Sequence, residues 1–458
     1  MDRNEFIARL LDRASEMEKA GDDATRAGSE ACYESGSSFE VEVKDGEIIG
    51  YSVSDSIGLG FRALTRQGRM GYASTQILDE AAVDQLLDGA LENAALVESR
   101  DEQFIFPGSD EYPDLKLYNP ALEEISAARK IEMAKELEKR TLAQDERIAQ
   151  VEGCAIFSSC DERALVNGAG LDVSMKVNLL GGYVAAVARD GEKVNTGFKM
   201  FFTQDPDEID LEQVARTAAQ EALAGLDGAP VPSGAYRVLL RRDVAATLLA
   251  TFAGVFSADN AQRGLSRLKG MEGEAIAAPC VTLMDDPHRA GSASSAPFDG
   301  EGVATVVKAV IGDGRLNTLL HNLKTAKKQG VETTANASRP GYAAPVGVAP
   351  SNFYFKPTGD GFDAMLAKLG DGLLITEMQG MHAGANPITG DFSLAAKGFR
   401  VRGGKIAEAV AQITIAGNFY ELLKAVEALG GDLEFQAPGA SCFGSPSVLV
   451  SQLSVAGT

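Results

Sequence analysis

The chain contains 458 residues, which is too long for one ordinary domain and predicts two or three. Hydrophobic residues make up 45% and charged residues 24%, a balance typical of a folded globular protein and not of a disordered or fibrous one. The formal net charge of -22 repels phosphate backbones, so we expect no nucleic-acid partner.

The first helix is predicted within residues 4–21, where the apolar residues recur at helical spacing. The period then changes to two, and residues 39–75 predict four antiparallel strands, with turns at Asp45-Gly46 and near Gln67-Gly68. A second amphipathic helix is predicted over residues 78–95.

The same order of elements recurs after a helix that we expect to begin at Asn119-Pro120. Residues 149–203 predict strands with a hairpin at Asp190-Gly191, and residues 210–226 predict a closing helix. This recurrence indicates an internal duplication whose two units pair their strands in one α+β domain.

A segment rich in Gly and Pro, residues 225–236, predicts the domain boundary. We therefore expect an N-terminal α+β domain over residues 1–228 and a C-terminal, mainly β domain over residues 234–458. The second domain is expected to contain a hairpin at Gly403-Gly404 and helices over residues 243–262 and 418–430. The fold class is thus α+β with mainly antiparallel sheets.

The composition also bears on the cellular compartment. The five cysteines are widely spaced and form no CxxC pair, so they indicate neither a disulfide framework nor a zinc knuckle. No apolar run approaches the ~20 residues that span a bilayer, and the first 21 residues lack the apolar region of a signal peptide. We expect a cytoplasmic protein with no membrane partner.

Candidate metal ligands lie in two loops. Residues 283–303 contain Asp285, Asp286, His288, Asp299 and Glu301, which could hold a divalent ion if the chain brings them together. The same Asp-Pro and Asp-Gly pairs also make ordinary turns, so both interpretations stay open.

The histidines give no sign of a zinc helix. His288, His321 and His382 are each more than thirty residues apart, so no two of them form an HExxH pair. His382 lies in a predicted loop and is either a functional group or an ordinary solvated side chain.

Four blocks rich in turn-forming residues follow one another along the chain. They read "GLGFRALTRQGRMGYAST", "MDDPHRAGSASSAPFDGEGV", "TTANASRPGYAAPVGVAPSNFYFKPTG" and "MQGMHAGANPITGDFSLAAKGFRVRGGKI". In this order, from about residue 38 onward, the chain resembles the TldD/PmbA family, whose members are described as modulators of DNA gyrase.

The resemblance implies a pair of paralogues. TldD carries an HExxxH zinc-peptidase helix, and PmbA, also called TldE, lacks it. Here the segment "LLATFAGV" aligns with the motif, which puts Ala250 and Val255 at the histidine positions and Thr251 at the glutamate position. This departure makes PmbA/TldE the better match, and it implies no zinc on this chain. The cysteine ligand of TldD is not carried over to Cys442.

The segment around these positions also has a prediction of its own. Residues 243–262 are expected to form one core helix, with Asp243 as its N-cap. The predicted buried residues are Val244, Leu248, Leu249, Phe252, Val255 and Phe256.

Three hypotheses about function remain open. In the first, which the resemblance favours, the chain is the non-catalytic subunit of a metalloprotease that degrades unstructured peptides, with zinc on a TldD-like partner. In the second, the chain is a stand-alone peptidase with a metal held by Asp285, Asp286, His288, Glu301 or His382. In the third, it is a non-enzymatic regulator linked to gyrase or to a toxin–antitoxin system. A homodimer is also compatible with the sequence.

Overall fold

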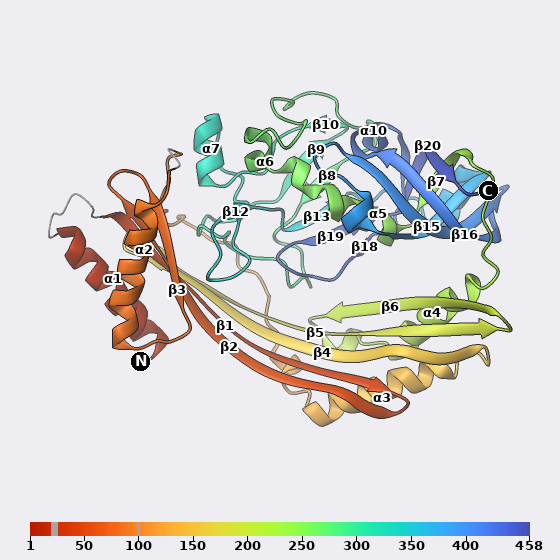
Figure 1. Cartoon of the computed structure of the whole chain (residues 1–458), viewed down its shortest axis with the longest axis horizontal. Coiled ribbons are helices and arrows are strands. Elements are labelled where there is room, and N and C mark those ends of the chain that lie inside the picture. The colour runs from red at the N-terminus through yellow and green to blue at the C-terminus, as the bar shows by residue number, and fades with distance from the viewer. Residues whose placement is uncertain (20–25, 99–100) are drawn as a thin grey trace.

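The computed structural model describes residues 1–19, 26–98 and 101–458. Within these residues, the strands form three six-stranded sheets and one two-stranded sheet, and most neighbouring strands run antiparallel (Figure 1). The fold is therefore α+β, as predicted. No helix in the described ranges is long and apolar enough to cross a membrane.

The N-terminal sheet has the strand order β3-β2-β1-β4-β5-β6. Its first unit comprises α1 (Arg3–Lys19), β1 (Arg26–Lys44), β2 (Glu47–Thr65), β3 (Met70–Thr75) and α2 (Glu80–Ala95). Its second comprises α3 (Ala127–Leu142), β4 (Ile148–Asn167), β5 (Asp172–Asp190), β6 (Lys193–Thr203) and α4 (Leu211–Ala224). The two units meet along β1 and β4, which confirms the predicted duplication and makes one continuous, curved sheet (Figure 1).

The predicted hairpins are confirmed where the dipeptide supplies positive φ angles. Asp45 and Gly46 have φ angles of 54° and 76° between β1 and β2, and Gly191 has 59° between β5 and β6. Asn, Asp and Gly tolerate this left-handed region, which the two-residue turn requires.

Two predictions in this part of the chain are wrong. Residues 39–75 form three strands and not four, because β2 continues through Ser56 and Ile57 and stays paired with β1 there. The helix expected at Asn119 is only a 3-10 turn, Pro120–Leu122, and α3 begins later, where the Ser126 hydroxyl accepts the N–H of Arg129. At Ser56, pairing with β1 outweighs the local tendency to turn. Before α3, Ser126 is a better N-cap than Asn119, so the helix begins there.

One face of the N-terminal sheet is covered by helices. Tyr33 and Val41 of β1 point to the same side because they are an even number of residues apart. Tyr33 packs with α1 and α2, and Val41 packs with α3 and α4. Cys32 points to the opposite side, where it packs against Phe298 from the C-terminal part of the chain. The sheet is therefore sandwiched between its own helices and the C-terminal body (Figure 1).

Two further six-stranded sheets form the C-terminal body. The middle sheet comprises, in spatial order, β10 (Arg315–Leu316), β9 (Lys308–Gly312), β8 (Leu283–Asp285), β13 (Asn352–Phe355), β19 (Cys442–Ser445) and β18 (Glu434–Phe435). The C-terminal sheet comprises β16 (Lys405–Asn418), β15 (Asp391–Arg402), β14 (Gly372–Gln379), β7 (Gly234–Leu240), β20 (Val448–Ala456) and β17 (Val426–Leu429). The predicted Gly403-Gly404 hairpin joins β15 and β16. Besides the segment at residues 242–262, this body contains β11 (Ala337–Ser338), β12 (Gly347–Val348), α7 (Leu323–Gln329), α8 (Phe362–Leu369), α9 (Met381–Gly384) and α10 (Phe419–Lys424).

The helix predicted over residues 243–262 is broken into three pieces. These are α5 (Arg242–Phe252), a 3-10 turn (Ala253–Phe256) and α6 (Ala258–Gln262), which starts afresh with Ser257 as its cap. Asp243 is not the N-cap, because Arg241 occupies that position and Asp243 instead pairs with its guanidinium at 2.7 Å.

The predicted buried side of this segment is confirmed. All six residues expected in the core, from Val244 to Phe256, are at most 3% exposed. Phe252 stacks on Phe419 with their ring centroids 4.8 Å apart. The helix predicted over residues 418–430 ends early, because residues from Val426 onward pair with β20 as strand β17.

Candidate functional site

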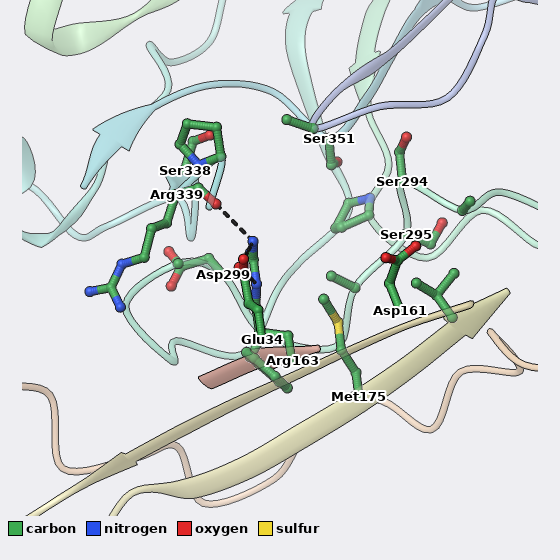
Figure 2. Close-up of a pocket in the computed structure, with 18 of the residues that line it drawn as sticks. Glu34, Asp161, Arg163, Met175, Ser294, Ser295, Asp299, Ser338, Arg339 and Ser351 are labelled. Atoms are coloured by element: carbon green, nitrogen blue, oxygen red, sulfur yellow. Dashed lines mark hydrogen bonds and ion pairs between the residues drawn. The ribbon is translucent and has the colours of Figure 1, made fainter. Parts of the chain in front are cut away.

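Two adjoining cavities lie between the N-terminal sheet and the C-terminal body. We call the first the central cavity; it has a volume of about 460 Å³ and is lined by β1, β4 and β5 and by loops at residues 293–300 and 335–342. Figure 2 shows its polar lining, in which Glu34, Asp161 and Arg163 rise from the sheet towards Ser294, Ser295 and Ser338 of the body. Both halves of the chain therefore contribute to one site.

The charged groups of the central cavity are partly committed to each other. The Arg163 guanidinium donates to Glu34 Oε1 at 2.7 Å and to the carbonyl of Arg339 at 2.8 Å. The Asp161 carboxylate has no salt bridge within the described residues, and burial raises its pKa. These contacts fix the sheet against the body and leave one carboxylate directed into the cavity (Figure 2).

A buried charge cluster adjoins the central cavity, and two of its members, Asp299 and Arg339, line the cavity. Glu30 pairs with Arg62 at 2.9 Å and with Arg339 at 3.1 Å, and Arg62 lies 3.8 Å from Glu301. Asp299 accepts N–H groups from Glu301, Val303 and Ala337. Burial and the neighbouring Glu301 raise the pKa of Asp299 to about 7, and burial raises that of Glu301. Two of these carboxylates, Glu30 and Glu301, thus share the guanidinium of Arg62, whereas Asp299 is held by backbone N–H groups.

The other candidate ligands are committed to structural contacts. Asp285 is fully buried and accepts hydrogen bonds from Lys308 Nζ, Asn336 Nδ2 and both the N–H and the hydroxyl of Ser351, at 2.7–2.9 Å. Asp286 accepts the N–H of His288 at 3.0 Å, as a turn-forming aspartate does.

The histidines do not join these carboxylates. His288 Nε2 lies 3.1 Å from the carbonyl and the hydroxyl of Thr305, and His382 is exposed on the short α9. Across the described ranges, no three His, Cys, Asp or Glu residues come together as a metal-binding group.

The second cavity lies beside α5, and we call it the α5 cavity. It has a volume of about 840 Å³ and is lined by the edge strand β6, the first turns of α5, and residues 433–438 with Cys442. Thr247 of α5 accepts a hydrogen bond from Gln436 at 2.6 Å, and the Cys442 thiol donates to the Gln436 carbonyl at 3.3 Å. Burial raises the pKa of Cys442 to about 11, so this thiol is protonated at neutral pH.

The positions of the resembled zinc motif lie one to two turns further along the same segment. Ala250 is half-buried, Val255 is 1% exposed, and the Thr251 hydroxyl donates to the carbonyl of Thr247 at 2.8 Å. Two aliphatic side chains and a hydroxyl that is already hydrogen-bonded offer no imidazole or carboxylate to a zinc ion. These residues do not fit that metal.

The sequence did not single out most residues that line either cavity. Arg163 lies on a strand whose alternation was visible, but its partners Glu34 and Arg339 are more than a hundred residues away in the chain. One feature of the α5 cavity was visible in the sequence. Phe198, Met200 and Phe202 lie on one side of β6 and give that side large apolar residues.

Comparison with protein-family models covers most of the chain. Residues 29–94 match PmbA/TldA metallopeptidase domain 1, residues 120–226 match the central domain, and residues 233–457 match the C-terminal domain. The chain belongs to the PmbA/TldD family. Membership rests on all three models in their order along the sequence.

Other PmbA/TldD proteins agree over nearly the full length. The chain is similar to the metalloprotease PmbA homolog of Haemophilus influenzae, at 28% identity over 95% of this chain and 94% of that protein. It is also similar to the metalloprotease PmbA of Escherichia coli O157:H7, at 28% identity over 94% and 92% of the two chains.

Solved PmbA/TldD structures share the fold. A candidate modulator of a DNA gyrase from Thermotoga maritima superposes with a TM-score of 0.89 and 32% identity, over 99% of this chain and 100% of that one. TldE from Thermococcus kodakarensis superposes with a TM-score of 0.88 at 22% identity, over 99% and 100%.

Proposed function

We propose that this chain is the PmbA/TldE-like, non-catalytic subunit of a metalloprotease complex, and that a TldD-like paralogue carries the zinc and cleaves the peptide bond. The observation that carries the proposal is the set of side chains at Ala250, Thr251 and Val255. A zinc peptidase of the HExxxH type needs neutral imidazoles to bind the ion and a carboxylate to accept a proton from its water. None of these three residues can do either.

The packing of the segment supports the same proposal. Val255 is buried in the main core of the C-terminal body, next to Phe252 and Phe256. A histidine ligand at that position must instead present its ring to a metal reached by substrate. The segment therefore serves the body as a core element in this subunit.

We further propose that the central cavity and the α5 cavity belong to the path of an unstructured peptide, in a chamber completed by the partner. The two cavities adjoin at Ala293, which lines both. Their walls come from both halves of the chain, and a chamber closed by the partner would admit an extended peptide and exclude a folded protein. We place this activity in the cytoplasm.

The test is cleavage of an unstructured peptide by this chain alone, by an HExxxH paralogue alone and by their mixture, each with and without a chelator. The expected result is cleavage that needs the mixture or is strongly enhanced by it, and that the chelator abolishes. The isolated chain should contain no stoichiometric zinc by atomic absorption.

Two outcomes would replace this proposal. Chelator-sensitive cleavage by this chain alone would favour the stand-alone peptidase, and the loops that carry His288 and His382 would then be mutated first. A stable complex with a target that stays uncleaved in every mixture would favour the regulator.

A further inference from the structure

The α5 cavity has an unusual wall, because five consecutive residues of β6, from Phe198 to Phe202, line it. A strand that meets a cavity with one face contributes only alternate residues. Five in a row mean that the strand meets the cavity with its edge. β6 is the last strand of the N-terminal sheet, so within the described part of the chain no strand pairs with the backbone groups on its outer side.

The opposite wall is also a sheet edge. β18 is the last strand of the middle sheet, and Glu434 and Phe435 of this strand line the same cavity. Lys199 of β6 forms a salt bridge with Glu434 of β18 at 2.7 Å. The two strand edges are therefore separated by the length of these two side chains. Extended backbone can enter such a space and form main-chain hydrogen bonds as an added strand.

Most charged residues that line the cavity pair with one another. Its basic residues are Lys199, Arg241, Arg242 and Arg289, and its acidic residues are Glu221, Asp243 and Glu434. Three of the basic side chains pair with these acids: Lys199 and Arg242 with Glu434, and Arg241 with Glu221 and Asp243. Arg242 also lies 3.9 Å from Asp432, just outside the lining, so Arg289 is the one basic residue of the lining that forms no salt bridge with the described residues.

Arg289 therefore differs from the other basic residues of the cavity. Its guanidinium lies 3.8 Å from the ring centroid of Phe435, and among the described residues it forms no salt bridge. Stacking on the ring holds the planar group in place and leaves its in-plane N–H donors available. A fixed guanidinium with available donors is suited to a bidentate bond with a carboxylate. The nearby thiol of Cys442 also lies within its electrostatic reach.

We propose that the α5 cavity binds an extended peptide that adds to the free edge of β6 and places a carboxylate on Arg289. Phe198, Met200 and Phe202 lie on one side of β6 and provide apolar contacts for alternate side chains of that peptide. The carboxylate belongs either to the peptide's C-terminus or to an acidic side chain. This inference rests on the proposed function only for the presence of a peptide in the cavity. The binding that we propose requires this chain alone.

The experiment measures binding of fluorescein-labelled peptides to the full chain, without a partner, by fluorescence anisotropy. Four six-residue peptides are built on one uncharged sequence and form two pairs. In the first pair, the C-terminus is either free or amidated. In the second pair, both peptides are amidated and one internal position is either Glu or Gln. We expect the best carboxylate peptide to bind about 10-fold or more tightly than its neutral counterpart, since hydrogen bonds to charged groups are worth this much. The preferred carboxylate peptide identifies the source of the charge.

Variants of the chain test the role of the guanidinium. Arg289→Gln should reduce binding of that peptide to the level of the neutral one, and Arg289→Lys should give an intermediate value because it keeps the charge but loses the planar fork. Arg66→Gln, at an exposed arginine in the turn after β2, is the matched control and should bind as the parent does. Equal binding by the parent and Arg289→Gln, with unchanged thermal melting, would overturn the carboxylate site.

Backbone N-methylation tests the strand pairing. Two versions of the preferred peptide carry N-methyl groups at odd or at even positions, and at least one must lose binding if the peptide pairs with β6. Full binding by both would overturn strand addition. Because neither measurement needs cleavage, failure here is distinguishable from failure of partner-dependent proteolysis.

Discussion

Glu30 of β1 and Arg62 of β2 lie directly opposite each other in the N-terminal sheet and form a two-pronged ion pair that is almost fully buried. Arg62 Nη2 donates to Glu30 Oε2 at 3.0 Å, and its Nε lies 2.9 Å from Oε1. The side chains are 2% and 0% exposed. Arg339, from the C-terminal body, joins the same carboxylate at 3.1 Å, so this pair also anchors the body to the sheet.

Removing the guanidinium should therefore be costly. Arg62→Met leaves Glu30 and Glu301 buried with fewer compensating charges, and we expect the free energy of unfolding to fall by about 3–5 kcal/mol. Urea unfolding measures the change. Arg66→Met, at an exposed position four residues later, should stay within about 0.5 kcal/mol of the parent. Equal midpoints for both variants would show that the cluster contributes little.

Asp299 should make stability depend on pH in an unusual direction. Its pKa is about 7 in the folded protein, because of burial and the nearby Glu301, and about 3.9 in an unfolded chain. Between these values the folded state retains a proton that the unfolded chain has lost, so the free energy of unfolding should decrease as pH rises from about 4 to about 7.

The Asp299→Asn variant isolates this contribution. Urea midpoints are measured for the parent and the variant at several values between pH 4.5 and 8. The difference between the two curves should change across this interval and level off above it. A constant difference at every pH would mean that Asp299 ionises normally. Asp360→Asn, at a half-exposed surface position, should leave the parent's curve unchanged.

Gly60 should not tolerate a side chain. A Cβ there would lie 1.7 Å from the carbonyl oxygen of Tyr342, a backbone atom of the body that cannot rotate away. We expect Gly60→Ala to lower the free energy of unfolding by about 1–3 kcal/mol or more, as overpacking does. At Gly359 no atom of the described residues lies within 4 Å of an added Cβ, so Gly359→Ala is the control. A stable Gly60→Ala protein would mean that the sheet and the body separate easily.

The α5 segment should respond to mutation as core and not as catalytic machinery. Phe252→Ala removes a ring that stacks on Phe419, and we expect a loss of about 3–5 kcal/mol in urea unfolding. Thr251→Ala, at the glutamate position of the zinc motif, should change stability by about 1 kcal/mol or less and leave peptide cleavage by the mixed complex unchanged. Loss of cleavage in Thr251→Ala without loss of stability would contradict the proposed division of labour.

Local chemistry explains which elements the sequence predicted. The hairpin turns at Asp45-Gly46 and at Gly191 were predicted because Asp and Gly accept positive φ, and the amphipathic helices because their apolar spacing is regular. Long-range pairing explains the errors. β2 passes Ser56 without a turn because β1 pairs with it, and the chain after Lys424 becomes β17 because β20 is available.

The sites were less predictable than the fold. From the sequence, Asp285 was either a metal ligand or a turn-forming residue, and only the structure brings Lys308, Asn336 and Ser351 to its oxygens. Arg289 gave no signal at all, because the ring on which it stacks belongs to Phe435, far along the chain. Properties that arise from pairs of distant residues are absent from local sequence patterns.

The junction between the two units of the N-terminal sheet sets an order of events during synthesis. Glu30 of β1 pairs with Asn167 of β4, so the inner edge of β1 has no partner until the ribosome has made the second unit. An unpaired strand of this length is a template for aggregation while it waits. β1 carries glutamates at positions 30, 34, 40 and 42, and their repulsion discourages two nascent chains from pairing with each other before β4 arrives.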